Sequence, residues 1–250
     1  MRYGPGLFAG WVGFCLLLCP EAQAGTFSND FNAGKPPDLN LYGTSAILTN
    51  GGFGNSGVLK LTANVNNQQG SMVIDDLDGG KPVAGFTATF KLRIGGGTGA
   101  DGFSFNFSTD LPRNVFGEDG AGTGLIIAFD TLDNGNREAP AIDVKFGGSL
   151  IASKRINPRT GDDFVDVVIN VDRDGGLDLV YGTTVIYTNL FAYTPFAGRF
   201  GLGARTGAAN DNHLVDDLKI TTTLQVGPYV KSVTPRGVEA RPDAPLAIEL

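Results

Sequence analysis

The stretch Phe86-Thr-Ala-Thr-Phe-Lys-Leu-Arg-Ile94 decides the fold, because apolar and polar side chains alternate along it without a break. Successive side chains of a β-strand point to opposite faces of the sheet. The even-numbered residues of this stretch are all apolar and the odd-numbered residues are all polar. The stretch therefore predicts a strand with one buried face and one face toward water.

The same alternation recurs on both sides of this stretch, and helical periodicity is nearly absent. It is clear in residues 103–107 and 165–171, and residues 172–176 have the composition of a hairpin turn before a return strand at 177–181. Further strands are predicted at 200–205 and 215–220. At least about ten short strands, each with one buried face, cannot be covered within a single sheet. The sequence predicts an all-β fold of two stacked antiparallel sheets, a β-sandwich or jelly roll.

Residues 1–24 have the pattern of a cleavable signal peptide. Arg2 is a short basic region, Leu7 to Cys19 is too short an apolar core to span a bilayer, and Ala22-Gln23-Ala24 is a small-residue cleavage site. We therefore expect an exported chain, secreted or held at the cell surface. Both cysteines lie in the removed segment, so no disulfide and no zinc–thiolate site is expected in the remainder.

The charge of the chain argues against two classes of partner. The formal net charge is -7, and removing residues 1–24 leaves it unchanged, because one basic and one acidic residue are lost. An acidic exported domain is a poor partner for nucleic acid or for an anionic membrane surface. No later apolar run is long enough for a transmembrane helix, so membrane insertion is not expected.

The composition divides the exported part into two regions. Residues 25–225, about 200 residues, are enough for one sizeable core and are predicted to form a single domain. Residues 226–250 contain a Pro- and Gly-marked linker. They then resemble the start of a further β domain, of immunoglobulin-like type.

The stretch Leu125 to Val144 (LIIAFDTLDNGNREAPAIDV) carries the clearest candidate for a functional loop. An apolar run delivers Asp130 to a polar loop, and strand alternation resumes at residue 141. A cluster of oxygen donors is what a hard cation such as Ca²⁺ needs. The alternative is a solvated turn, since Asp, Asn and Gly also dominate turns for backbone reasons.

Three segments, taken in order, resemble the L-type (legume-like) lectins of the concanavalin A-like lectin/glucanase superfamily, in a bacterial-type secreted module. They are GADGFSFNF at 99–107, IAFDTLDN at 127–134 with IDV at 142–144, and FGLGARTGAANDNH at 200–213. The last is especially similar to the animal cargo-receptor branch. The resemblance spans residues 25–224 and implies a concanavalin A-like jelly-roll β-sandwich.

The resemblance also implies a site. Asp101 matches the carboxylate that accepts hydrogen bonds from two sugar hydroxyls, after a cis peptide that would be Ala100–Asp101. Asp130 matches a Ca²⁺-binding carboxylate, Leu132 would supply its carbonyl, and Asn134 would bind Ca²⁺ and also donate to the sugar. Gly207 and Ala208 match backbone positions that close the sugar pocket.

Departures from the family pattern limit what is carried over. Ala128 stands where legume lectins have the glutamate that binds a second, transition metal, so no second metal is expected. The loop before Asp143 is shorter than in legume lectins, and Asp133 and Glu138 are candidates for a missing ligand by proximity only. Leu132 replaces an aromatic residue that often stacks on the sugar.

His213, the only histidine, has two interpretations. It either points into the site or is a hydrogen-bonded residue at a loop end.

The function predicted is a non-catalytic, Ca²⁺-assisted module that binds a glycan or polysaccharide. One alternative is a laminin-G-like structural or adhesion module without sugar binding. The other is a glycoside hydrolase of the same fold, which needs two carboxylates about 5–5.5 Å apart if it retains configuration. The glutamates of the exported part, Glu118, Glu138, Glu239 and Glu249, lack the hydrolase spacing, so an enzyme is not expected. The oligomeric state is left open, because pairing of sheet edges cannot be read from one chain.

Overall fold

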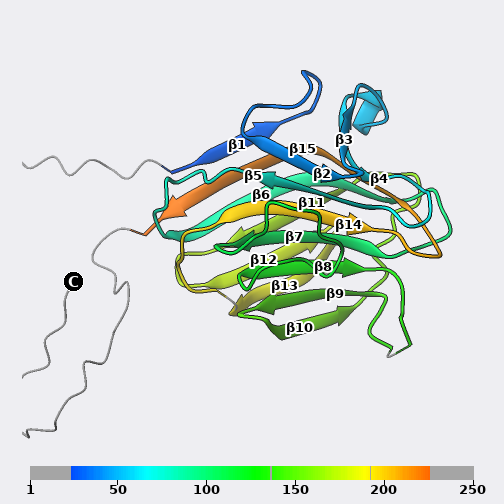
Figure 1. Cartoon of the computed structure of the whole chain (residues 1–250). Helices are drawn as coiled ribbons and strands as arrows, with labels where there is room; N and C mark the ends of the chain where they lie inside the picture. Colours follow the sequence, from blue (N-terminus) through cyan, green and yellow to red (C-terminus); the bar gives the residue numbers. More distant parts are fainter. Residues whose placement is uncertain (1–23, 136, 192, 226–250) are drawn as a thin grey trace, which may run out of the picture.

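Two antiparallel sheets form the described part of the chain, residues 24–135, 137–191 and 193–225 of a computed structural model (Figure 1). The eight-stranded sheet has the order β13 (Thr184–Phe191), β12 (Gly176–Tyr181), β11 (Val165–Val171), β6 (Val83–Gly95), β15 (Asn212–Leu224), β4 (Val58–Thr62) and β3 (Ala46–Leu48), with β1 (Thr26–Asn29) also beside β15. The seven-stranded sheet has the order β10 (Ser149–Arg155), β9 (Ala141–Phe146), β8 (Leu125–Asp130), β7 (Gly102–Ser108), β14 (Arg199–Arg205), β5 (Gln69–Ile74) and β2 (Leu39–Gly43). A short 3₁₀ turn, η1 (Phe53–Asn55), precedes β4. The predicted jelly-roll sandwich of two antiparallel sheets is confirmed.

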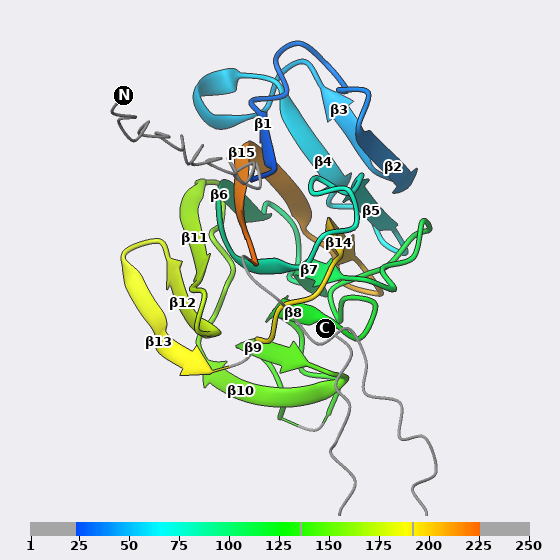
Figure 2. The ribbon, with the colours of Figure 1, turned by 90° about the vertical axis from the view of Figure 1, so that its left-hand side faces the viewer.

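Strand β6 contains the alternating stretch and has the predicted half-buried form. Phe86, Ala88, Phe90, Leu92 and Ile94 are all buried in the core, whereas Thr87 is exposed and Lys91 and Arg93 are partly exposed. The strand pairs with β11 on one side and β15 on the other. The β11–β12 hairpin closes where residues 172–176 were expected to turn, with Asp172 N donating to Gly176 O at 2.8 Å. Figure 2 shows β11, β12 and β13 side by side along one flank of the molecule.

Aromatic rings join the two sheets. The ring centroid of Phe86, on the eight-stranded sheet, lies 5.9 Å from that of Phe105, 5.5 Å from that of Phe107 and 5.0 Å from that of Phe200 on the opposite sheet. Aromatic pairs at such distances add to the free energy gained by burying their area. This core fixes β7 and β14 rigidly, and the ends of these two strands carry the predicted site.

Strand register brings three distant loops to the same end of the sandwich. Gly102, at the start of β7, lies opposite Asp130 at the end of β8 and opposite Arg205 at the end of β14. The loops 95–101, 131–140 and 206–211 therefore meet at the right-hand end in Figure 1. The start of β1 and the end of β15 lie at the other end.

The segment between β7 and β8, residues 109–124, lies over the outer face of the seven-stranded sheet. Phe116 is buried against Val73 and Leu111. A Cβ atom placed on Gly203 would lie 2.4 Å from the Phe116 ring, so only a glycine lets the ring rest on β14. This packing places Glu118, two residues later, beside Gly102, at the end of the sandwich where the loops 95–101, 131–140 and 206–211 lie. We call this end the loop end.

The predictions for the signal peptide and for residues 226–250 concern residues outside the described part, except for Ala24. They stay predictions. Within the described residues, the first strand begins at Thr26 and the last ends at Leu224. No helix among these residues is long and apolar enough to cross a membrane.

Candidate functional site

Asp101 is the first residue of the candidate site along the chain. It follows a cis Ala100–Asp101 peptide, as the resemblance implies. Its backbone is fixed from both neighbouring strands' ends: its N–H donates to Arg205 O at 2.9 Å, and its carbonyl accepts from Thr131 N at 2.9 Å. The side chain is 6% exposed. The charged group beside its carboxylate is the guanidinium of Arg205, whose Nε lies 3.1 Å from Asp101 Oδ2. Burial raises the pKa of this carboxyl, while the positive charge of Arg205 opposes the rise and Asp119 adds to it.

Gly207 lies directly beside the Asp101 carboxylate. A Cβ atom added to Gly207 would lie 3.2 and 3.3 Å from the two carboxylate oxygens, so a side chain here would crowd them. The carbonyl of Gly207 accepts from Asn67 N at 3.1 Å, which ties the 206–211 loop to the loop before β5. Ala208 is exposed next to it. The structure thus places Gly207 beside Asp101, with Ala208 next in the chain, and their assignment to sugar binding stays a prediction.

Arg205 is the residue of this site that sequence reasoning missed. Its Nε lies 3.1 Å from Asp101 Oδ2, and also 3.1 and 3.0 Å from the two carboxylate oxygens of Glu118, to which it donates. Its Nη2 donates to Glu118 Oε1. The Glu118 side chain is almost fully buried, whereas that of Arg205 is 42% exposed. Arg205 therefore joins two nearly buried carboxylates and still reaches solvent.

A second ion pair holds the loops on which Asp101 and Gly207 lie. The buried Asp211 accepts from Arg159 Nε at 2.8 Å and Nη2 at 3.0 Å, and from Gly97 N at 3.0 Å. Arg159 also donates to Gly97 O, and its guanidinium packs against Gly99, whose φ is +99°. A bidentate pair of this kind is strong and directional. It fixes the 95–101 loop to the 206–211 loop at a short distance from Asp101.

Asp130 ends β8 opposite Gly102 and is partly buried. Burial raises its pKa to about 6, a backbone hydrogen bond from Leu132 N opposes the rise, and the carboxylates of Glu118, Asp119 and Glu138 add to it. Several negative charges thus surround one carboxylate. Such a place favours a bound cation, because the cation would relieve their repulsion.

The loop after Asp130 is closed by its own side chains. Asp130 Oδ1 accepts from Leu132 N at 3.0 Å, and Glu138 Oε1 accepts from Asn134 N at 2.6 Å. Asp133 Oδ1 accepts from Gly135 N at 2.9 Å and Arg137 N at 2.8 Å. These bonds explain why Asp133 and Glu138, the two candidates by proximity, stand in this loop: both cap backbone N–H groups.

The predicted Ca²⁺ ligands fit a hard cation by donor type. The Asp130 carboxylate, the Leu132 carbonyl and the Asn134 amide oxygen are all oxygen donors. Asn134 Nδ2 donates to Leu132 O at 3.3 Å, so these two groups are already neighbours. No three His, Cys, Asp or Glu side chains of the described residues come together as a metal site would require. A cation here would depend on backbone, amide and water oxygens besides Asp130.

His213 is the second residue of β15, directly after the 206–211 loop, and it is fully buried. Its Nδ1 is 2.7 Å from Thr62 Oγ1, and no described residue hydrogen-bonds to its buried Nε2. Burial lowers its pKa to about 4, with Asp211 opposing the shift. Of the two interpretations of this histidine, the structure supports a buried, hydrogen-bonded residue.

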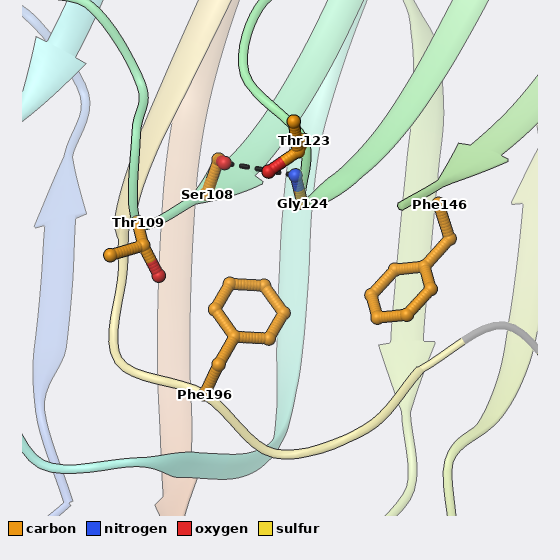
Figure 3. A pocket seen from close by; sticks show the side chains of 6 residues that line it. All are labelled: Ser108, Thr109, Thr123, Gly124, Phe146 and Phe196. Carbon is orange, nitrogen blue, oxygen red and sulfur yellow. Dashed lines mark hydrogen bonds between the residues drawn. The ribbon is translucent and has the colours of Figure 1, made fainter. Parts of the chain in front are cut away.

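A small cavity of about 140 Å³ lies at the opposite end of β7 from Asp101. Figure 3 shows it between the rings of Phe146 and Phe196, with Thr109 nearby and Ser108 accepting from Gly124 N at 2.9 Å. Its hydroxyl groups bond to neighbouring protein groups, such as Thr109 Oγ1 to Ala197 O. The cavity is separate from the site built on Asp101.

The fold of this chain is that of the L-type lectins. The exoplasmic/lumenal domain of VIP36 in its metal-free form aligns with a TM-score of 0.63 at 17% identity, over 83% of this chain and 95% of that domain. Its form with bound Ca²⁺ and Man3GlcNAc gives a TM-score of 0.59 at 19% identity, over 78% and 87%. Peanut lectin gives 0.61 at 19% identity, over 82% of this chain and all (100%) of that one. A scan against protein-family models and a search of curated protein sequences gave no match.

Proposed function

We propose that this chain is a secreted, non-catalytic module that binds a glycan through the loop end of the sandwich. The observation that carries the proposal is the Asp101 carboxylate. It is almost buried, it faces Gly207, and Arg205, which lies 3.1 Å from its Oδ2, is shared with Glu118. An ionised carboxylate forms charge-assisted hydrogen bonds with hydroxyl groups, which a sugar offers in pairs. Structures of the same fold have been solved with sugars bound, VIP36 with Man3GlcNAc and the lectin UEA-II with galactose, which supports the same class of ligand.

We assign four residues to sugar binding. Asp101 accepts from sugar hydroxyls, Asn134 donates its side-chain N–H, and the backbone around Gly207 and Ala208 closes the pocket. Small residues at the last two positions let the ligand approach the backbone closely. Arg205 is an additional donor in our proposal, since its guanidinium stands beside Asp101 and reaches solvent.

We further propose that Ca²⁺ assists binding, held by Asp130, Leu132 and Asn134. The ion would supply positive charge next to a carboxylate whose pKa is raised to about 6, mainly by burial. Asp130 would hold the ion, and Asn134, held through its side-chain oxygen, would present its side-chain N–H to the ligand. Structures of VIP36 with bound Ca²⁺ support this assignment by likeness of fold.

The second candidate is a structural or adhesion module without sugar binding. One observation favours it: the carboxylates of Asp130, Asp133 and Glu138 accept hydrogen bonds from backbone N–H groups of their own loop. Chelation would then affect neither the loop nor any ligand.

The test is a glycan array on the exported protein, run with Ca²⁺ and again with a chelator. We expect binding that is lost on chelation. Replacing Asp101 by Asn should weaken it by about 10- to 150-fold, since a hydrogen bond to a charged group contributes about 1.5–3 kcal/mol. Asp166→Asn, an exposed carboxylate of β11 on the other sheet, is the matched control. A folded protein that binds nothing in either condition would favour the structural module, and binding unchanged by Asp101→Asn would move the site elsewhere.

A further inference from the structure

The nitrogen of Gly25, just before β1, lies in a small polar site at the end of the sandwich away from Asp101. It is 3.0 Å from Asp78 Oδ1 and 2.8 Å from Thr222 Oγ1. Thr222 Oγ1 also donates to Asp78 Oδ1 at 2.8 Å, and Thr222 N donates to Gly25 O at 2.9 Å. The two acceptors thus converge on one nitrogen atom.

Asp78 has no cationic partner among the described residues. Its side chain is buried, and none of the ion pairs found in the described part includes it. A buried carboxylate without a positive partner is costly. The neutral N–H of Gly25 meets only part of this need.

Position 25 accepts no residue larger than glycine. A Cβ atom added there would lie 2.6 Å from Leu77 Cβ and 2.7 Å from Leu77 O. Ala24, the preceding residue, is exposed. The packed part of the molecule therefore begins at the residue that follows the Ala22-Gln23-Ala24 motif.

We propose that a leader peptidase cuts the chain between Ala24 and Gly25, and that the new α-ammonium group of Gly25 forms an ion pair with Asp78. In the cleavage, water adds across the peptide bond, Ala24 keeps the carboxylate, and the Gly25 amine takes up a proton. The nitrogen need not move, because it already lies within hydrogen-bond distance of both acceptors. The new cation supplies the charge that the buried Asp78 lacks. This inference is independent of glycan binding.

Other titratable groups near this site are Asp76, which accepts from Asp78 N at 2.9 Å, and Tyr193. Burial raises the pKa of Tyr193 above its ordinary value, and Asp78 adds to the rise, so Tyr193 remains neutral in mildly alkaline solution. An α-amino group has an ordinary pKa of about 7.7–8.0. Pairing with Asp78 raises the pKa of the Gly25 amine. Its stabilising effect is therefore complete below about pH 7.7 and is lost as the pH rises through the raised value.

The first experiment is mass spectrometry of the full chain expressed in a secreting host. The expected amino-terminal residue of the exported protein is Gly25. A chain that begins at any other residue overturns the proposed cleavage.

The second experiment measures unfolding by urea at pH 7.5 and pH 10 for three proteins that continue to Leu250. One begins at Gly25, one begins at Ala24, which moves the ammonium along the chain by about 3.8 Å, and one begins at Gly25 with Asp78→Asn. The folding equilibrium constant of the first should fall about tenfold more between the two pH values than that of the other two, for a pKa raised by about one unit. Equal pH dependence in the first two proteins overturns the ion pair, whether or not Asp78→Asn folds.

Discussion

At the scale of single residues, Arg205 links the candidate ligand site to the scaffold. It stands two residues before Gly207 and bridges Asp101 and Glu118. Removing only Arg205 would leave the buried Glu118 without a partner, which costs about 3–5 kcal/mol for a buried pair. A fair test of its role must therefore neutralise both partners together.

We predict that Arg205→Gln with Glu118→Gln lowers glycan affinity by about tenfold or more, because the ligand loses a charged donor beside Asp101. Titration calorimetry with the glycan identified on the array measures the change. The matched control is Arg113→Gln with Asp75→Asn, an exposed ion pair whose loss should leave affinity unchanged. Normal glycan affinity in the first double variant would mean that Arg205 has only a structural role and does not contact the ligand.

His213 gives the molecule a pH dependence of stability. Its pKa is lowered to about 4 by burial, whereas the unfolded chain takes up a proton near pH 6.5. The unfolded state therefore binds more protons as the pH falls from about 6.5 to 4, and the free energy of unfolding decreases by up to about 3 kcal/mol. Free energies of unfolding measured by urea at pH 7.5 and pH 5 should show about 2 kcal/mol of this decrease in the natural protein. In His213→Gln the decrease over the same range should be smaller, and equal decreases would contradict the assignment.

At the scale of elements, the packing of residues 109–124 on β14 decides where Glu118 lies. We predict that Gly203→Ala destabilises the protein by about 1–3 kcal/mol, because the new methyl group overlaps the Phe116 ring and Gly117 O. Unfolding by urea measures the loss. The same variant should bind glycan more weakly, since the displaced segment moves Glu118 away from Arg205.

A double-mutant cycle checks this explanation. In Gly203→Ala with Phe116→Ala the ring that causes the overlap is gone, so the combined loss should be smaller than the sum of the two single losses. Simple additivity would mean that the methyl group acts through Gly117 O alone.

The elements also show how far sequence reasoning reaches. β6 and β11 could be predicted because one face of each strand is buried and the other faces solvent, so apolar and polar residues alternate along the sequence. β10 gave no such signal, since nearly all its residues are exposed on both faces. The path of residues 109–124 could not be predicted either, because it depends on a contact between Phe116 and glycines about 85–87 positions later, which no local pattern records.

The residues of the candidate site also fall into two groups, those that a local motif predicts and those that only the fold brings together. Asp101, Asp130 and Asn134 were found because each belongs to a short motif that resembles the L-type lectins. Glu118 and Arg205 lie 87 positions apart, and Arg159 and Asp211 lie 52 apart. Only the strand register brings these partners together, so their pairing requires the fold. A useful signal was present all the same: Arg205 is a charged residue in a strand of small and apolar residues, two positions before Gly207.

At the scale of the whole molecule, the sandwich separates two tasks. The ends of β7, β8 and β14 present the loops of the candidate site, while β1 and β15 meet at the far end. The aromatic core between the sheets lies between these ends and connects them rigidly. Changes at the far end, such as a processed amino terminus, should therefore alter stability without altering the choice of ligand.

The pairing of the first and last strands also has a mechanical consequence. Gly25 and Thr222 are hydrogen-bonded neighbours where the chain enters β1 and nears the end of β15. A force that pulls on both flanks of the module would load this antiparallel pair at one end. The force would then break the hydrogen bonds between β1 and β15 one after another, instead of loading all of them at once in shear. Tension along the chain would thus first detach the four-residue strand β1. The loops around Asp101 would bear none of the force.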